Sequence, residues 1–193
     1  MKYMDFKISG WSAIATVLII LLSFILSTYV SSTSKFLSIT IIILSMIASA
    51  LVLLGYLDLS SNVRTMFLKN MTIVSLIVLA VSTIFYIIDA FLVFKNLYLN
   101  IAFVVFGLAY LVFGISLFQL KDMFHGLAIS LAIVYIIQGI AYASVIAPFT
   151  SILIAVAPFT SILVGILESI LFFNASKVQA FFSPQTIPEV RMR

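Results

Sequence analysis

The chain has 193 residues, of which 64% are hydrophobic and 8% are charged. A water-facing domain of this length carries about a quarter charged residues, so the composition excludes a soluble globule and predicts an all-α, polytopic membrane protein. The formal net charge is +4, but the basic residues are scattered singly between apolar runs, so no nucleic-acid partner is expected. With no cysteine and a single histidine, His125, the chain is expected to hold neither a metal nor a cofactor of its own.

Six runs are long enough to cross a bilayer, which takes about 20 apolar residues. The connections between them are short, and the longest is the polar stretch Ser60–Asn70, which is a possible docking loop for a cytoplasmic partner. The first run exceeds the apolar core of a secretory signal and no cleavage site follows it cleanly. The tail 174–193 contains Pro184 and Pro188 and is expected to be extended or disordered. The sequence thus predicts a single six-helix domain over residues 1–173, with spans at 9–30, 36–57, 71–94, 97–120, 125–147 and 151–173.

The last two spans come from one apolar run, 126–173, which is more than twice the length of one span. Pro148 is the predicted turn, because a turn at Pro158 leaves too few residues for a sixth span. Residues 147–153 and 157–163 both read APFTSIL. This duplication indicates either a local tandem repeat that leaves Pro158 as a kink in the sixth helix, or a broken, re-entrant helix whose ends hold an ion. We favour the kink, since the first four spans contain no matching proline.

The distribution of Lys and Arg predicts the orientation of the bundle. Eight of these residues fall on one side of the six-span path, whereas only Lys35 and Lys95 fall on the other. Since cytoplasmic loops carry the excess of basic residues, both termini are expected to be cytoplasmic, with the protein in the cell membrane. The basic residues assigned to the cytoplasmic side are Lys2, Lys7, Arg64, Lys69, Lys121, Lys177, Arg191 and Arg193.

Two carboxylates, Asp89 and Glu168, lie inside apolar spans and are candidate ion or proton sites. Asp89 is expected in the outer leaflet, near Lys95. Glu168 is expected near the inner surface, six residues before Asn174. We therefore expect two separate positions, each either held at its interface or used to bind a proton or cation.

Polar and small residues recur at helical spacing in several spans. Stripes of this kind indicate close helix packing through interhelical hydrogen bonds, and a water-lined path is the alternative. Gln138 is expected near the middle of the fifth span, as a hydrogen bond within the bundle. His125 is expected to be solvated at the inner surface, with a pH-sensing role as the alternative. The stripes are Ser12, Thr16, Ser23 and Ser27; Ser75, Ser82 and Asp89; Ser161, Gly165 and Glu168; and, for small residues, Ala128, Ala132, Gly139 and Ala143, with Gly107 and Gly114 on the fourth span.

Three segments carry a resemblance: LVLLGYLDL at 51–59, LVFGISLFQL at 111–120 and ILESILFF at 166–173. Here the chain resembles small multispanning membrane proteins of uncharacterised function from thermoacidophilic archaea. The resemblance implies architecture and location only, so it assigns no functional residue.

The short loops and the lack of catalytic motifs lead us to expect a structural or accessory component of a membrane assembly, and no enzyme. Its expected partners are the lipid bilayer and either another membrane protein or further copies of itself. The alternative is a small oligomeric transporter or channel for a cation, a proton or a small solute, using Asp89, Gln138 or Glu168.

Overall fold

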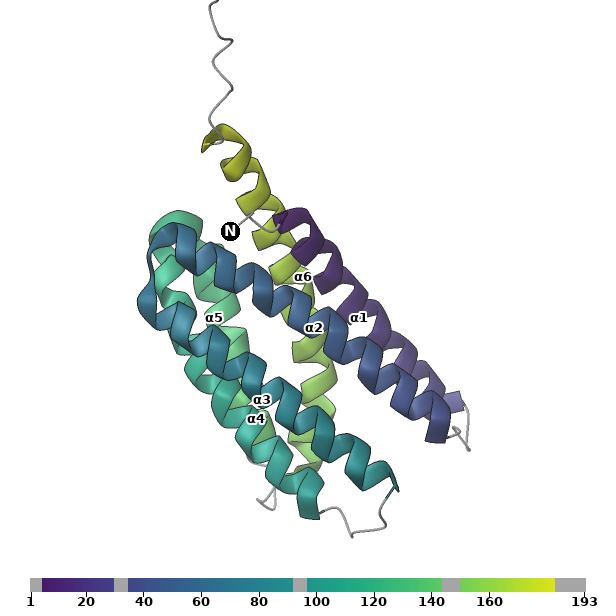
Figure 1. Cartoon of the computed structure of the whole chain (residues 1–193). Helices are drawn as coiled ribbons and strands as arrows, with labels where there is room; N and C mark the ends of the chain where they lie inside the picture. The colour runs from purple at the N-terminus through teal and green to yellow at the C-terminus, as the bar shows by residue number, and fades with distance from the viewer. Residues whose placement is uncertain (1–4, 30–34, 92–96, 144–149, 183–193) are drawn as a thin grey trace, which may run out of the picture.

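The computed structural model describes residues 5–29, 35–91, 97–143 and 150–182, and all the elements in these ranges are helical (Figure 1). Consecutive helices lie side by side and antiparallel, which agrees with the short connections between them. The elements are α1 (Phe6–Tyr29), α2 (Lys35–Val63), α3 (Met66–Phe91), α4 (Leu97–Leu117), the 3₁₀ turn η1 (Phe118–Leu120), α5 (Lys121–Ala143) and α6 (Thr150–Phe182).

The apolar character of these helices confirms the predicted all-helical membrane class. Within the described residues, five stretches are long and apolar enough to cross a membrane, and one of them covers α4, η1 and α5 together. Many large apolar side chains on the outside of the bundle are exposed, as expected for a surface that faces lipid, including Leu18, Leu22, Ile77 and Ile84. The five stretches are Phe6–Leu26, Leu37–Val63, Met66–Ile88, Ile101–Ala143 and Pro158–Val178.

Close contacts at glycine join α4 to α5, and the predicted small-residue face of α5 is confirmed. A Cβ on Gly107 would lie 2.4 Å from the backbone nitrogen of Ala143, and one on Gly114 would lie 2.9 Å from the carbonyl oxygen of Ala132. Gly139 faces α4 just as closely, because its Cβ would lie 2.6 Å from the nitrogen of Leu111. Because glycine has no side chain, the backbones of α4 and α5 can approach closely, and such close approach stabilises helix packing in lipid.

A second close contact brings the first helix beside the last. A Cβ on Gly165 of α6 would lie 2.5 Å from Cγ2 of Val17 on α1. Nearer the start of α1, a Cβ on Gly10 would lie 3.2 Å from the ring of Phe173. The contact between α1 and α6 therefore closes the bundle (Figure 1).

The α2–α3 connection is much shorter than predicted. Only Arg64 and Thr65 are non-helical, whereas Ser60–Asn70 was expected to form a polar loop. Arg64 has a φ of 59°, and the Thr65 N–H donates to the Ser60 carbonyl oxygen at 3.0 Å, which together form a Schellman cap. The prediction of an exposed polar loop at Ser60–Asn70 was therefore wrong. Polar residues near a helix end remain helical where the end of the helix is capped.

The reversal between α4 and α5 occurs at His125, whose φ is 40° and ψ is −123°. This backbone conformation is strained for any residue with a Cβ. The side chain of His125 is exposed, so the residue serves here as the turn between two antiparallel helices.

Helix α6 extends beyond its predicted end and passes through Pro158 without interruption. It was expected to end at Phe173, but it continues to Phe182 and projects past the start of α1 (Figure 1). The polar residues after Phe173 indicate where the helix leaves the membrane, and nothing in that segment stops the helix. Pro158 thus lies inside the helix, as favoured, whereas Pro148 lies outside the described residues.

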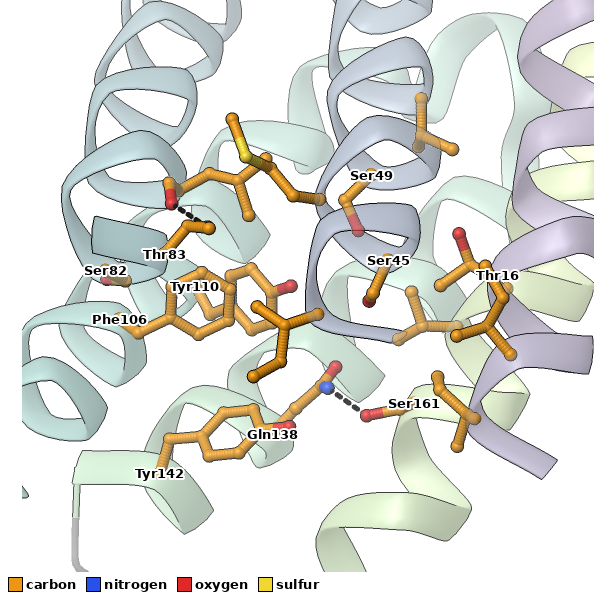
Figure 2. A pocket seen from close by; sticks show the side chains of 18 of the residues that line it. Thr16, Ser45, Ser49, Ser82, Thr83, Phe106, Tyr110, Gln138, Tyr142 and Ser161 are labelled. Carbon is orange, nitrogen blue, oxygen red and sulfur yellow. Dashed lines mark hydrogen bonds between the residues drawn. The ribbon is translucent and has the colours of Figure 1, made fainter. Parts of the chain in front are cut away.

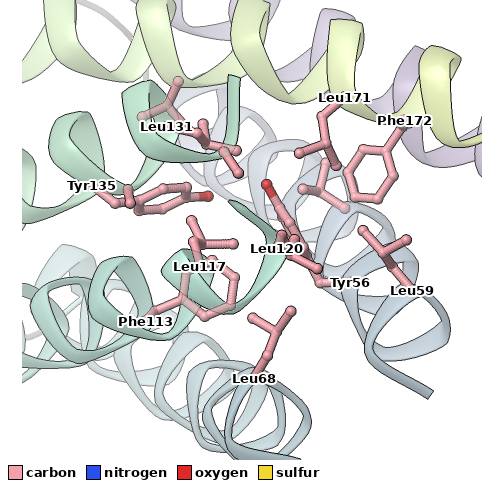
Figure 3. Packing of buried hydrophobic residues seen from close by; sticks show 14 of the residues in the cluster. Tyr56, Leu59, Leu68, Phe113, Leu117, Leu120, Leu131, Tyr135, Leu171 and Phe172 are labelled. Atoms are coloured by element: carbon pink, nitrogen blue, oxygen red, sulfur yellow. The ribbon is translucent and has the colours of Figure 1, made fainter. Parts of the chain in front are cut away.

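The two ends of the bundle are packed differently. We call the end where α1 begins, α6 ends and Arg64 and His125 lie the packed end. Most of the largest fully buried side chains belong to it, and they come from α2, α3, η1, α4, α5 and α6 (Figure 3). They include Tyr56, Leu68, Phe113, Leu117, Leu120, Leu131, Leu171 and Phe172.

Candidate functional site

The half of the bundle away from the packed end encloses a cavity of about 630 Å³. Small-molecule sites in proteins commonly have volumes of about 300–1,000 Å³. All six long helices contribute to its walls, and Figure 2 shows polar side chains directed into it from several of them. The polar lining consists of Thr16, Ser23, Ser45, Ser49, Ser75, Ser82, Thr83, Tyr86, Tyr110, Tyr135, Gln138, Tyr142, Ser161 and Glu168.

The exposed fraction of the lining side chains decreases from the α2 wall of the cavity to its floor, which is formed by Tyr135 and Glu168. Ser45 and Ser49 of α2 are partly exposed, whereas Tyr135 and Glu168 at the floor are each only 4% exposed. One helical turn below the floor lies the packed end, where Phe113 of α4 is 1% exposed and Leu131 of α5 is fully buried. The cavity is therefore closed at one end by close side-chain packing.

Glu168 lies on α6 six residues before Asn174, where the polar residues at the end of the apolar run begin. Its side chain is 4% exposed, so it is buried between helices. Its expected position near the inner surface stays a prediction, because α6 continues as a helix for two more turns beyond Asn174 and the end of the helix does not mark the edge of the membrane. A carboxylate inside an apolar span is costly when it is charged and unpaired, so its partners matter.

The Tyr135 hydroxyl of α5 supplies one partner and donates a hydrogen bond to Oε1 of Glu168. The Tyr56 hydroxyl of α2 also interacts with this carboxylate electrostatically, but it makes no hydrogen bond. Figure 3 shows the Tyr56 and Tyr135 hydroxyls directed toward each other. One phenolic hydroxyl thus donates to the buried acid, and a second lies near it without a hydrogen bond.

Gln138 lies one helical turn from Tyr135 on the same face of α5. Its Nε2 donates to Oγ of Ser161 on α6 at 2.5 Å (Figure 2). Its Oε1 atom has no hydrogen-bond partner, although the side chain is only 3% exposed. The expectation of a hydrogen bond within the bundle is confirmed for the amide nitrogen, and the carbonyl oxygen is buried without a hydrogen-bond partner.

A continuous set of aromatic rings lines the cavity and leads down to the packed end. The centroid of Tyr110 lies 5.2 Å from that of Tyr135 and 6.0 Å from that of Tyr142. Below them, Tyr135 contacts Phe113 at 5.1 Å, and Phe113 contacts Tyr56 at 5.2 Å. These aromatic residues were not among the predicted site residues. Their spacing on two adjacent helices, 106, 110 and 113 beside 135 and 142, was the signal that pointed to it.

The polar stripes converge on the cavity instead of serving mainly as contacts between helices. Ser75 and Ser82 line it from α3, and Ser161 and Glu168 line it from α6. On α1, Ser12, Thr16 and Ser23 donate to carbonyl oxygens of their own helix, so the expected interhelical bonds are not formed by these residues.

The other predicted site residues are placed as follows. Asp89 belongs to the last turn of α3, but its side chain lies outside the described residues. Pro158 lines the cavity. Over the described ranges, no group of three or more His, Cys, Asp and Glu side chains is placed to hold a metal ion.

Comparison with protein-family models, with curated proteins and with solved structures found no match to this chain.

Proposed function

We propose that this protein is a small transporter that binds a solute in the cavity and moves it across the membrane. The observation that carries the proposal is the asymmetry of the bundle. A cavity with polar groups among mainly apolar walls reaches down to Glu168, and a packed layer of side chains closes it below. Alternating access requires a site near the bilayer midplane that is open on one side and sealed on the other.

The buried carboxylate gives this site chemistry that a purely structural bundle does not need. Ionisable groups at mid-membrane depth are costly and generally mark ion, proton or substrate sites. Glu168 is paired with neutral groups only, Tyr135 and Tyr56, so the described partners leave its charge uncompensated. A bound cation or proton would supply the missing compensation.

The small residues also favour a self-contained bundle. Six of the seven glycines lie within van der Waals distance of a neighbouring helix of the same chain, and only Gly126 has open space around it. Small-residue faces that commonly bind partner helices are therefore already occupied. This supports transport over the accessory role expected from the sequence.

The proposal includes six spans with both termini in the cytoplasm. Helix α4 has 21 residues, and α5 after its reversal at His125 is nearly as long, so each can cross a core of about 30 Å. Lys7, Arg64, Lys69 and Lys121 belong to the packed end, and the positive-inside rule supports a cytoplasmic location for that end. The cavity then faces the outside of the cell.

Single-cysteine labelling tests the proposal directly, because the native chain contains no cysteine. Ser49→Cys places a thiol on the cavity wall, and Ser116→Cys places one in the packed end, where Ser116 is fully buried. In oriented proteoliposomes, we expect a small membrane-impermeant thiol reagent to reach the first from outside and the second from inside. Blocking Ser49→Cys with a bulky label should stop labelling of Ser116→Cys in the double variant.

Two results would overturn the proposal. If Ser49→Cys reacts no faster than Ser116→Cys from the outside, the cavity is not an aqueous site. If Ser116→Cys reacts from neither side, the bundle does not alternate, and the accessory role becomes the better explanation. Stoichiometric co-purification of other membrane proteins in mild detergent, with a native mass to match, would support that accessory role.

A further inference from the structure

We infer that the solute is a protonated amine with an aromatic or aliphatic body, bound through Glu168 and Gln138 with its apolar part against the tyrosine rings. This inference rests on the proposed function and names its substrate class. It follows from the charge of the lining, from one unused acceptor and from the aromatic walls.

The charge of the cavity selects a cation. Among the described residues that line it, Glu168 is the only carboxylate, and no Lys, Arg or His side chain is present. An anion would enter a low-dielectric space that already holds a carboxylate and no positive group, which is strongly unfavourable. A cation would instead pair with Glu168, where the low dielectric strengthens the attraction.

The unpartnered Oε1 atom of Gln138 favours a cation that carries N–H groups over a cation without them. Oε1 of Gln138 is buried without a partner, and Gln138 follows Tyr135 by three residues, about 4.5 Å along the axis of α5. A buried carbonyl oxygen without a donor carries a desolvation cost that a ligand can remove. A primary ammonium has three N–H groups that can donate to acceptors of this kind, whereas a quaternary ammonium has none.

The rest of the cavity fits an organic body better than a bare metal ion. The volume of about 630 Å³ far exceeds that of a hard cation, which needs six or more oxygens at about 2.0–2.6 Å. Tyr110, Tyr142 and Phe106 form a connected aromatic wall, with Phe106 and Tyr110 centroids 4.3 Å apart and Phe106 and Tyr142 centroids 5.8 Å apart. Such faces bind apolar groups by area and ammonium groups by cation–π attraction.

The experiment compares three probes that share a phenyl ring and a short chain. They are 2-phenylethylammonium, the neutral 2-phenylethanol and the anionic 3-phenylpropanoate. Binding of each to the full-length protein in nanodiscs is measured by equilibrium dialysis, with empty nanodiscs to subtract partition into lipid. We expect saturable binding of the ammonium only. Equal affinity for the neutral probe, or binding of the anion, would overturn the inference.

Variants locate the site. We expect Glu168→Gln to weaken ammonium binding at least tenfold, whereas Asp122→Asn, the same change at an exposed acid of the packed end, should leave it unchanged. Tyr142→Phe should preserve binding, and Tyr142→Leu should weaken it several-fold because the ring is lost. Phenyltrimethylammonium should bind at least fivefold more weakly than the primary amine. Wild-type affinity in Glu168→Gln, or a quaternary probe that binds as well as the amine, would contradict the assignment.

The outcome is separable from that of the proposed function. Alternating reactivity of Ser49→Cys and Ser116→Cys without ammonium binding would leave the transporter standing and overturn the substrate class. Ammonium binding that depends on Glu168, in a protein whose thiols never alternate, would support the amine site and overturn transport.

Discussion

The Tyr135 hydroxyl donates a hydrogen bond to the Glu168 carboxylate across the contact between α5 and α6. Both side chains are 4% exposed, and they are 33 positions apart in the chain. This bond ties the floor of the cavity to the helix that carries the acid. It therefore connects the stability of the bundle to the charge of the site.

Tyr135→Phe removes that donor while keeping the ring contacts with Phe113 and Tyr110. We expect the free energy of unfolding to fall by about 1 kcal/mol, because a buried carboxylate loses a hydrogen bond. The measurement is thermal unfolding in detergent. In a cycle with Glu168→Gln, the two changes should be non-additive by a similar amount. Additive effects would show that the two groups do not interact.

Gln138→Leu is expected to separate stability from binding. The substitution removes the unpartnered Oε1 atom together with the hydrogen bond from Nε2 to Ser161, two effects of opposite sign, so the apparent Tm should change little while ammonium affinity falls at least threefold. Gln119→Leu is the matched control. The Oε1 atom of Gln119 accepts the backbone N–H of Leu68 at 3.1 Å in the first turn of α3, so its loss should lower the apparent Tm without changing affinity. A large loss of stability in Gln138→Leu would argue that its amide is structural.

Gly139→Ala tests the α4–α5 contact. The added Cβ would lie 2.6 Å from the backbone nitrogen of Leu111, so the helices must separate. We expect a loss of about 2 kcal/mol, which outweighs the gain of up to about 1 kcal/mol in helix propensity. Gly126→Ala is the control, since a Cβ there meets nothing within 4 Å. Comparable apparent Tm values for the two variants would contradict the contact.

His125→Gly should stabilise the protein. At a φ of 40° and a ψ of −123°, a residue with a Cβ is strained and glycine is not, so we expect a gain of about 1 kcal/mol despite the greater freedom of glycine in the unfolded chain. His125→Ala keeps the Cβ and should give no gain. If alanine stabilises as much as glycine, the imidazole itself was the unfavourable group, and the strain argument is wrong.

Orientation is tested with thiols at opposite ends of the bundle. Asp122→Cys lies at the packed end, and Ser32→Cys lies in the connection between α1 and α2. On intact cells, we expect an impermeant thiol reagent to label Ser32→Cys, and to label Asp122→Cys only after permeabilisation. The reverse pattern would place the packed end outside and turn the cavity toward the cytoplasm.

The start of α4 at Leu97 and the passage of α6 through Pro158 agree with the sequence-based expectation. The predicted helix boundaries were wrong where polar residues were taken to mark the end of a helix. Ser60–Asn70 is almost wholly helical, and α6 continues past Asn174 to Phe182. Hydropathy reports where a helix leaves lipid, but capping and packing decide where the helix itself ends.

The candidate site was predicted in part. Glu168 and Gln138 were identified because a polar side chain inside an apolar span has a high free-energy cost, which depends on residue type and depth. The aromatic wall of Tyr110 and Tyr142 was not identified, because aromatic residues are common in this chain and their spacing alone does not mark a site.

The sequence by itself determined that the chain is a bundle of apolar helices, because in lipid each helix must satisfy its backbone hydrogen bonds within its own segment. Helix packing is a property of side-chain shape summed over several segments. The tertiary structure alone therefore decided that Tyr135, Gln138 and Glu168 meet at the floor of one cavity. It also decided that one end of the bundle is closed while the other holds that cavity, since close contacts such as Gly139 with Leu111 depend on which helices become neighbours.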